Sequence, residues 1–389
     1  MDLYLETIVL SHPGVSEEAR RNSFEQFSRQ FNTLNLSLTE EKPDLLLFTT
    51  GGSEHLAIQH LRPDHFILLA ANRQANAFAS AMEVMAYARK NEVPARLICL
   101  DDEQDQKSFL EYTDLLLALK HLRNSTVGLI GESSPWLVAS GISSELLSKR
   151  LSVQLKRISW DELKDYRKYQ PGKDFLEKYG QNNAGGMEDA SRINAVLAEA
   201  VEQYHLDAVA VECFPLVQQQ HVTACLSLSD LNDRGIVAAC EGDLPSMVGM
   251  MIGKAISGMV PWMANVAAIN NNAVLLAHCT APTNLLSGFT IDTHYETGEG
   301  TAIMGEFKGD EVTVFRLDND LERIFLSCGH IIERPQNPWA CRTQINVEMP
   351  GEAIFTLKSD PLGNHHLVLP GNQYDTLKKM SEILSLEEI

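Results

Sequence analysis

The sequence has little positive charge. It contains 32 Lys and Arg residues against 52 Asp and Glu residues, which gives a formal net charge of −20 at pH 7. A surface with this balance repels the phosphate backbones of DNA and RNA, so we expect no nucleic-acid partner. The sequence also lacks any apolar run of about 20 residues, the length that a membrane-spanning helix needs. We therefore expect no membrane partner.

Cysteine pairs and targeting signals are absent as well. The seven cysteines are odd in number, and no two of them have the C-x-x-C spacing of a zinc or redox motif. Most of them lie in apolar runs, which predicts buried free thiols in a reducing compartment. The first residues, MDLYLETIVL, show neither a basic region nor a cleavage site, so they predict a strand rather than a signal peptide. These observations predict a cytoplasmic protein.

Several common cofactor and nucleophile motifs are missing. The sequence has no G-x-G-x-x-G dinucleotide fingerprint and no phosphate-binding P-loop. The segment GESSP at 131–135 lacks the second glycine that a nucleophile elbow of α/β-hydrolases needs. The sequence therefore carries no motif for these three kinds of chemistry.

The sequence does contain a regular alternation of strands and helices. Up to residue 122, apolar runs such as PDLLLFTT and HFILLAA alternate with amphipathic stretches, which predicts a parallel sheet covered on both faces. The alternation then resumes, whereas from residue 286 a period of two between Gly and Asp turns indicates hairpins. We therefore predict an α/β protein with two doubly wound, Rossmann-like domains at 1–122 and 123–285, and a mainly antiparallel β domain at 286–389.

Acids and a histidine follow several of the predicted strands. Glu212, Glu241 and His278 each stand at the carboxyl end of an apolar run, where the ligands of open α/β sheets collect. Glu241 belongs to the sequence CEGD, so Asp243 follows two residues later. An acid at the end of a buried strand is unfavourable unless a cation or a helix N-terminus compensates its charge. The sequence leaves both explanations open.

The segment GNHHLVLPG contributes two adjacent histidines, His365 and His366. Adjacent side chains of a strand point to opposite faces, so at most one of the two should join a site with the acids. Carboxylate oxygens and imidazole nitrogens are ligands that Mn²⁺, Mg²⁺ or Zn²⁺ takes. A divalent-cation site is therefore one interpretation of these residues.

Four stretches of the sequence together resemble a known superfamily. In chain order they are ACEGDLPSMVGMMIGKAISGMVPWMAN, VLLAHCTAP, THYETGEGTAIMGEFKGDEVTVFRL and GNHHLVLPG. They are similar to the L-fucose isomerase and L-arabinose isomerase superfamily, and most of all to its fucose-isomerase-like branch. The resemblance covers residues 205–371. It implies a Mn²⁺-dependent enzyme that interconverts an aldose and a ketose through an enediol, assembled as a homotrimer or homohexamer.

The resemblance also implies roles for single residues. Glu241 matches a carboxylate that is both metal ligand and catalytic group, and His365 matches a metal-binding histidine of the C-terminal β domain. His278 matches a further metal histidine of the arabinose-type enzymes. His294 and Glu296 lie where the family places a loop that faces the substrate. Glu212 and His366 are our remaining candidates for contacts with the monosaccharide.

One position departs from the family pattern. The second catalytic carboxylate belongs 24 residues after the first, and this chain has Asn265 there. An amide oxygen can bind a metal, so we predict Asn265 as a ligand at this catalytic position, but an amide cannot carry a proton as a carboxylate does. Asp243, Glu296 or Glu212 could take the acid–base role. The alternatives are a C2 epimerase and a catalytically silent sugar-binding or regulatory protein on the same fold.

The resemblance leaves the sugar open among pentoses, 6-deoxyhexoses and sulfonated hexoses. A sulfonate would need a basic contact. The basic side chains that we consider for it are Arg73, Lys254, Arg316 and Arg342.

Overall fold

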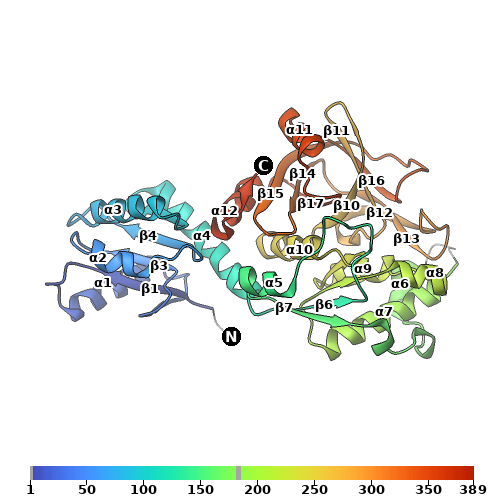
Figure 1. The fold of residues 1–389 in the computed structure, drawn as a ribbon, viewed down its shortest axis with the longest axis horizontal. Coiled ribbons are helices and arrows are strands. Elements are labelled where there is room, and N and C mark those ends of the chain that lie inside the picture. The colour runs from blue at the N-terminus through green and yellow to red at the C-terminus, as the bar shows by residue number, and fades with distance from the viewer. Residues whose placement is uncertain (1–2, 181–184) are drawn as a thin grey trace. The chain divides into compact units, whose positions relative to one another are not determined.

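The computed structural model describes residues 3–180 and 185–389. The chain forms two compact units, which are drawn in Figure 1. The N-terminal unit consists of Met1–His121 and Lys379–Leu386, and the main unit consists of Leu122–Lys378 and Glu387–Ile389. The predicted second domain and most of the predicted third domain fall within the main unit, whereas Lys379–Leu386 of the third belongs to the N-terminal unit. The predicted division into three domains remains a prediction.

The N-terminal unit is built on a five-stranded parallel sheet in the order β2-β1-β3-β4-β5. The two central strands, β3 and β4, are buried along their whole length because helices cover both faces, as their continuous apolar sequences predict. The strands are β1 (Leu5–Leu10), β2 (Leu36–Leu38), β3 (Leu45–Phe48), β4 (Ile67–Ala71) and β5 (Ala95–Cys99). The helices are α1 (Glu17–Gln30), α2 (Glu54–Ala57), α3 (Ala77–Lys90) and α4 (Glu103–Leu122).

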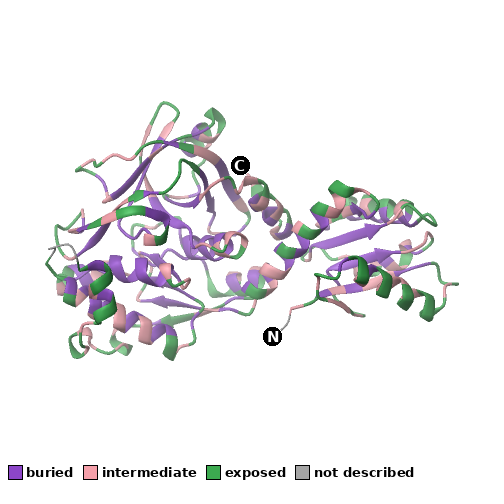
Figure 2. Ribbon diagram, turned by 180° about the vertical axis from the view of Figure 1, so that it is seen from behind, coloured by how far each residue is buried: buried purple, intermediate pink, exposed green. Residues whose placement is uncertain are grey.

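The main unit begins with a second parallel sheet, of four strands in the order β7-β6-β8-β9. Figure 2 shows the outer sides of its helices exposed; three of its strands, β6, β8 and β9, are largely buried, whereas the edge strand β7 is mostly exposed. The strands are β6 (Thr126–Ile130), β7 (Gln154–Ile158), β8 (Ala208–Val211) and β9 (Val237–Cys240). The helices are α5 (Ser144–Leu151), α6 (Lys173–Tyr179), α7 (Met187–Gln203), α8 (Phe214–Gln220), α9 (Cys225–Asp233) and α10 (Leu244–Ser257).

The rest of the main unit is a β-barrel. Six antiparallel strands pair in the order β14-β17-β10-β11-β16-β15, and β14 also pairs with β15, which closes the ring. A hairpin of β12 and β13 lies outside the ring, and β18 pairs with β15. The strands are β10 (Trp262–Asn270), β11 (Ala273–His278), β12 (Leu286–Asp292), β13 (Ala302–Phe307), β14 (Glu311–Leu317), β15 (Arg323–Glu333), β16 (Thr343–Glu348), β17 (His365–Pro370) and β18 (Glu387–Glu388); the helices are α11 (Gly351–Ser359) and α12 (Tyr374–Leu384).

These sheets confirm the predicted fold class, with parallel α/β sheets followed by a mostly antiparallel β part. They differ from the prediction in where the antiparallel part begins. The strands β10 and β11 belong to the barrel, so the change of sheet precedes residue 286. Strand β11 is apolar up to His278 because the barrel buries it, whereas only the first three residues of β10 are buried. A buried apolar run does not distinguish a parallel from an antiparallel neighbour.

Helix α10 brings the parallel sheet and the barrel together. It follows β9 directly, and it carries Gly249 and Gly253 on the side that faces the barrel. A Cβ atom at Gly249 would overlap the side chain of Leu367 in β17, and one at Gly253 would overlap Pro261. The two glycines therefore allow the helix to approach the barrel closely, which holds the end of β9 near the start of β17.

The structure agrees with two expectations from composition. All seven cysteines are free thiols, and five of them are buried. Within residues 3–180 and 185–389, no helix combines the length and apolarity that crossing a membrane requires. The cytoplasmic location and the lack of a nucleic-acid partner remain predictions.

Candidate metal centre

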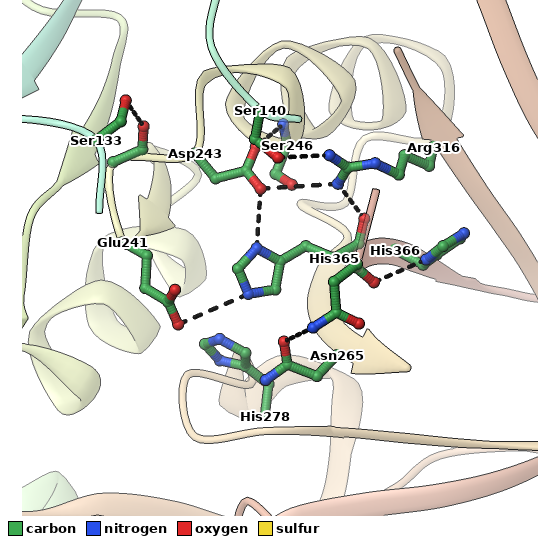
Figure 3. Close-up of polar contacts among 12 residues, drawn as sticks. Ser133, Ser140, Glu241, Asp243, Ser246, Asn265, His278, Arg316, His365 and His366 are labelled. Atoms are coloured by element: carbon green, nitrogen blue, oxygen red, sulfur yellow. Dashed lines mark hydrogen bonds and ion pairs between the residues drawn. The ribbon is translucent and has the colours of Figure 1, made fainter. Parts of the chain in front are cut away.

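The turn after β9 places a carboxylate at the edge of the parallel sheet. Glu241 has a φ of +60° and Gly242 one of +66°, a left-handed conformation that is strained for any residue except glycine. A Cβ atom at Gly242 would lie 2.5 Å from the carbonyl oxygen of Glu132, so only glycine fits there. The turn aims Glu241 at the barrel, as Figure 3 shows.

His365, the first residue of β17, faces this carboxylate. Its Nε2 lies 3.7 Å from Glu241 Oε1. This Nε2 is buried, and no atom in the described ranges hydrogen-bonds to it. On the other side of the ring, Nδ1 donates to Asp243 Oδ2 at 2.8 Å. Such a carboxylate partner holds the ring in place and leaves Nε2 to accept a ligand.

His278, the last residue of β11, completes a group of three. Its ring centroid is 5.5 Å from that of His365, and its Nδ1 contacts Thr280 Oγ1 at 2.9 Å. The ligand atoms of Glu241, His278 and His365 all lie within 4.8 Å of one another. One carboxylate and two imidazoles form a donor set that suits a divalent transition metal. These residues therefore fit a divalent cation, and His365 Nε2 is the buried polar atom that the cation would satisfy.

The charges of the three residues complement one another. Burial alone would raise the pKa of Glu241, but His365 outweighs burial and lowers this pKa to about 2. Burial would lower the pKa of His365, yet Asp243 and Glu241 raise it to about 9. Burial lowers the pKa of His278 to about 3, so this ring is neutral at pH 7. A protonated His365 thus supplies positive charge between two carboxylates, a charge that a metal ion would replace.

Asp243 lies behind His365 rather than beside it. The side chain is fully buried, and Oδ1 accepts from the backbone N–H of Ser246 at 2.8 Å, which caps helix α10. With its other oxygen on His365, Asp243 orients this histidine. Its surroundings do not suit the catalytic role that we predicted from the sequence. The sequence left a cation and a helix N-terminus as explanations for these acids. The helix N-terminus accounts for Asp243, whereas Glu241 faces the candidate metal ligands.

A buried arginine compensates the charge of Asp243. Arg316 of β14 lies 3.7 Å from Asp243 Oδ2, and it donates to the carbonyl oxygen of His365 and to Ser140 Oγ. Only 1% of the side chain is exposed. Arg316 was considered as a sulfonate contact, but its observed partners make it part of the frame that positions His365.

Asn265 lies next to the candidate ligands. It stands on β10, directly opposite His365 of β17 and opposite Ala277 of β11. Its Oδ1 accepts from Asn364 Nδ2 at 2.8 Å. In Figure 3 its amide is drawn beside the ring of His278 and below the ring of His365. The structure therefore brings Asn265 to the site. Its amide oxygen is a kind of atom that can bind a metal ion as a further ligand.

The second histidine of the pair points the other way. His366 Nδ1 donates to the carbonyl oxygen of Asn364 at 2.9 Å, and its ring packs edge-on against Phe325 at 5.3 Å. Burial lowers its pKa to about 3. His366 is thus a neutral core residue, and this position does not suit the substrate contact that we predicted for it.

The remaining candidates, His294, Glu296 and Glu212, differ in their relation to the group of Glu241, His278 and His365. His294 is buried; burial lowers its pKa, and the charge of Glu241 opposes this shift. Glu296 is exposed, and its pKa is raised by desolvation and by the negative charge of Glu241. Glu212 instead turns toward β6, where its Oε2 accepts from the N–H of Glu132 at 2.8 Å and borders a separate cavity of about 810 Å³. The electrostatic effects thus connect His294 and Glu296 with Glu241.

One contributor had no signal in the sequence. Trp136, in the segment between β6 and α5, donates from Nε1 to Glu241 Oε2 at 2.5 Å. Ser134 N–H donates to the carbonyl oxygen of Glu241 at 2.9 Å. In the sequence, this segment showed only GESSP at 131–135, an incomplete match to a nucleophile elbow. A loop residue that acts through its tertiary position has no periodicity by which it could be found.

No protein-family model matches the sequence. Among curated proteins, the chain is similar to several that are named sulfoquinovose isomerase. It is 23% identical over 309 residues to those of Priestia aryabhattai and Priestia megaterium, a match that covers 74% of this chain and 69% of each relative. It is 22% identical over 288 residues to that of Alkalicoccus urumqiensis, covering 69% of this chain and 65% of the relative. The names confirm the predicted class of enzyme, a sugar isomerase, and the fucose-isomerase-like branch remains a prediction.

Proposed function

We propose that this chain is a metal-dependent isomerase that interconverts an aldose and a ketose through an enediol. The observation that carries the proposal is the buried Nε2 of His365, which has no hydrogen-bond partner among the described residues and faces Glu241 Oε1 at 3.7 Å beside the neutral His278. A ring held in this way by Asp243 is an arrangement typical of metal-binding histidines. Similarity to curated isomerases supports the same conclusion.

The residues that would hold the cation are Glu241, His278 and His365, with the amide oxygen of Asn265 as a fourth ligand. Imidazole and carboxylate donors admit Mn²⁺, and we propose Mn²⁺ as the cofactor. The cation, when bound, would supply positive charge that stabilises the negative charge of an enediolate. The chain itself holds His365 through Asp243 and Arg316, so the ligand set is oriented before the metal binds.

The proton between C1 and C2 requires a group that can both give and accept it. We propose Glu296 for this role in place of the carboxylate that Asn265 lacks. Glu296 is exposed and its pKa is raised by desolvation and by Glu241, and a raised pKa brings a carboxyl group closer to the pH at which it exchanges protons efficiently. Both oxygens of Asp243 are occupied, and Glu212 turns toward β6.

The substrate that we propose to test first is sulfoquinovose, because the relatives are named for it. All four basic side chains considered for a sulfonate already have partners within the chain, since Arg73 lies 4.0 Å from Asp102 Oδ2. Arg316 is bound as described, Arg342 donates to Thr293 and pairs with Asp292 at 3.3 Å, and Lys254 donates to the carbonyl oxygen of Gly235. A sulfonate contact would therefore come from another residue or another subunit, and a homotrimer or homohexamer remains our proposal for the assembly.

The experiment that tests the function has two stages. Calorimetry on metal-stripped protein measures the binding of Mn²⁺, and we expect one site per chain. The Mn²⁺-loaded protein is then incubated in D₂O with sulfoquinovose, L-fucose or L-arabinose, and NMR follows deuterium exchange at C2. Exchange with formation of a ketose supports the isomerase, and exchange that yields only a C2 epimer would replace it with an epimerase.

Asn265 is the observation that favours a second candidate, a catalytically silent sugar-binding protein. Such a protein would bind a sugar with saturable affinity and show no deuterium exchange at C2. A wild-type chain that does not bind Mn²⁺ at all would contradict the isomerase.

A further inference from the structure

The segment Gly131–Gly141 lies across the metal motif and is attached to it along its length. Near its beginning, Ser133 Oγ donates to the carbonyl oxygen of Gly242 at 2.8 Å. Near its end, Ser140 Oγ accepts from Arg316, the residue that compensates Asp243. Between these anchors lies Trp136, whose ring nitrogen donates to Glu241. Because both sides of the segment are held, Trp136 is positioned before any ligand arrives.

Trp136 is unusual in its exposure. Although its indole N–H binds a largely buried carboxylate, 47% of the residue is exposed. A large apolar ring that stays in contact with solvent beside a candidate metal centre suggests a ligand rather than a core. The ring edge of Trp136 packs on Phe214 at 4.6 Å, and Phe214 packs edge-on against His294 at 5.7 Å. These three rings form a continuous aromatic wall along one side of Glu241.

We propose that Trp136 is a substrate-binding residue, whose exposed indole face receives the apolar C–H face of a monosaccharide held at the metal centre. The proposal rests on the proposed function, because it needs a sugar at Glu241. The indole N–H fixes one oxygen of Glu241, and Glu241 Oε1 then remains directed at His365. One side chain thus serves both the metal ligand and the sugar.

The metal group and the neighbouring polar residues can satisfy the sugar's hydroxyl groups, but none of them covers its carbon skeleton. Ligand sites usually combine a few polar groups with apolar or aromatic walls for this reason. In the described part of the main unit, Trp136 is the exposed aromatic ring that hydrogen-bonds to a residue of the candidate metal group.

Two substitutions separate the two roles of the side chain. Trp136→Phe keeps an aromatic face and removes the N–H donor, whereas Trp136→Gln keeps an N–H donor and removes the face. Trp339→Phe is the matched control, because Trp339 is similarly exposed at 52% and has no part in the metal group. Circular dichroism and thermal unfolding confirm that each variant is folded.

The measurements are Mn²⁺ affinity by calorimetry, and kcat and KM of the Mn²⁺-loaded protein with sulfoquinovose, L-fucose or L-arabinose. For Trp136→Gln we expect Mn²⁺ affinity within about threefold of wild type and a KM about tenfold higher with kcat little changed, the effect of losing one aromatic contact. For Trp136→Phe we expect weaker Mn²⁺ binding and a KM within about threefold of wild type. Trp339→Phe should match the wild type in both.

Each outcome decides the proposal. The proposal is supported if Trp136→Gln raises KM and keeps Mn²⁺ affinity, while Trp136→Phe weakens Mn²⁺ binding and keeps KM. A wild-type KM in Trp136→Gln overturns the role of Trp136 and leaves the isomerase standing. Equal losses of Mn²⁺ and sugar affinity in both variants would make Trp136 only a support for Glu241. A wild-type chain that binds Mn²⁺ but neither binds nor converts any of the sugars overturns both this proposal and the proposed function.

Discussion

In each of the two parallel sheets of this protein, a buried strand is followed by a glycine-containing turn and an acid, but the two acids have different surroundings. In the N-terminal unit, the buried strand β3 leads through glycines to Glu54; in the main unit, the buried strand β9 leads to Glu241. Glu54 starts the short helix α2, and hydrogen bonds to its own backbone N–H and to Ser80 lower its pKa. Glu241 faces two histidines that the barrel supplies. An acid at a strand end therefore becomes a candidate ligand only where a second sheet presents partners.

The strongest test of this difference compares the two acids. Glu241→Gln should weaken Mn²⁺ binding by more than about 100-fold, since loss of a direct ligand should exceed the 10–100-fold effect of an outer partner. Glu54→Gln is the matched control and should bind Mn²⁺ as the wild type does. Calorimetry measures the Mn²⁺ affinity of both variants. Equal Mn²⁺ affinities would show that Glu241 is not a metal ligand.

The adjacent histidines give the next test. His365→Ala should weaken Mn²⁺ binding by a similar order, because it removes the Nε2 that faces Glu241. His366→Ala should leave Mn²⁺ affinity within about threefold, and it should lower the free energy of unfolding by about 2–4 kcal/mol, the cost typical of a cavity in a packed core. Calorimetry and urea unfolding measure the two effects. The reverse ranking in affinity would mean that the strand presents its other face to the metal.

The support behind His365 should have a smaller effect. Asp243→Asn keeps an oxygen that can cap α10, but it removes the charge that accepts the Nδ1–H of His365. We expect Mn²⁺ affinity to fall about 10–100-fold. Asp230→Asn, which alters a carboxylate paired with Lys178, serves as the control and should leave Mn²⁺ affinity unchanged. An unchanged affinity in Asp243→Asn would contradict the positioning role.

The pKa of His365 predicts opposite effects of pH on metal binding and on stability. Because this pKa is about 9 in the folded chain and 6.5 is its ordinary value, the metal-free protein gains stability from His365 below about pH 6.5 and loses it as the pH rises to 9. Metal binding must displace that proton, so Mn²⁺ affinity should rise up to about tenfold per pH unit over the same range. Calorimetry in buffers of different ionisation enthalpy measures the released proton. Absence of proton release at pH 7 would contradict the assignment.

The smallest expected effect concerns Asn265. Asn265→Asp restores a carboxylate at the position where the resembled family has one, and we expect isomerisation to become a few-fold faster. Asn265→Ala is the comparison, because it removes the amide oxygen without adding an acid. Glu296→Gln should abolish deuterium exchange at C2, because we propose that Glu296 carries the proton. Exchange at the wild-type rate in Glu296→Gln would contradict that role.

Much of the site could be predicted from the sequence because strand ends are local features. Apolar runs end at Glu241 and at His278, and another begins with His365 and His366. The structure brings Glu241, His278 and His365 together. The rule that adjacent strand residues face opposite sides correctly indicated that only one of His365 and His366 joins them. Asp243 could not be assigned, because a helix cap and a metal ligand are the same residue type at the same place.

The sequence by itself determined the parallel α/β sheets and the antiparallel character of the C-terminal part, since the periodicity of strands and helices is a local property. Only the tertiary structure decided that β10 and β11 join the barrel, that Arg316 and Asp243 stand behind His365, and that Trp136 reaches Glu241 from a distant loop. These contacts join residues more than 50 positions apart in the chain. Their energies depend on packing and burial, which no local pattern encodes.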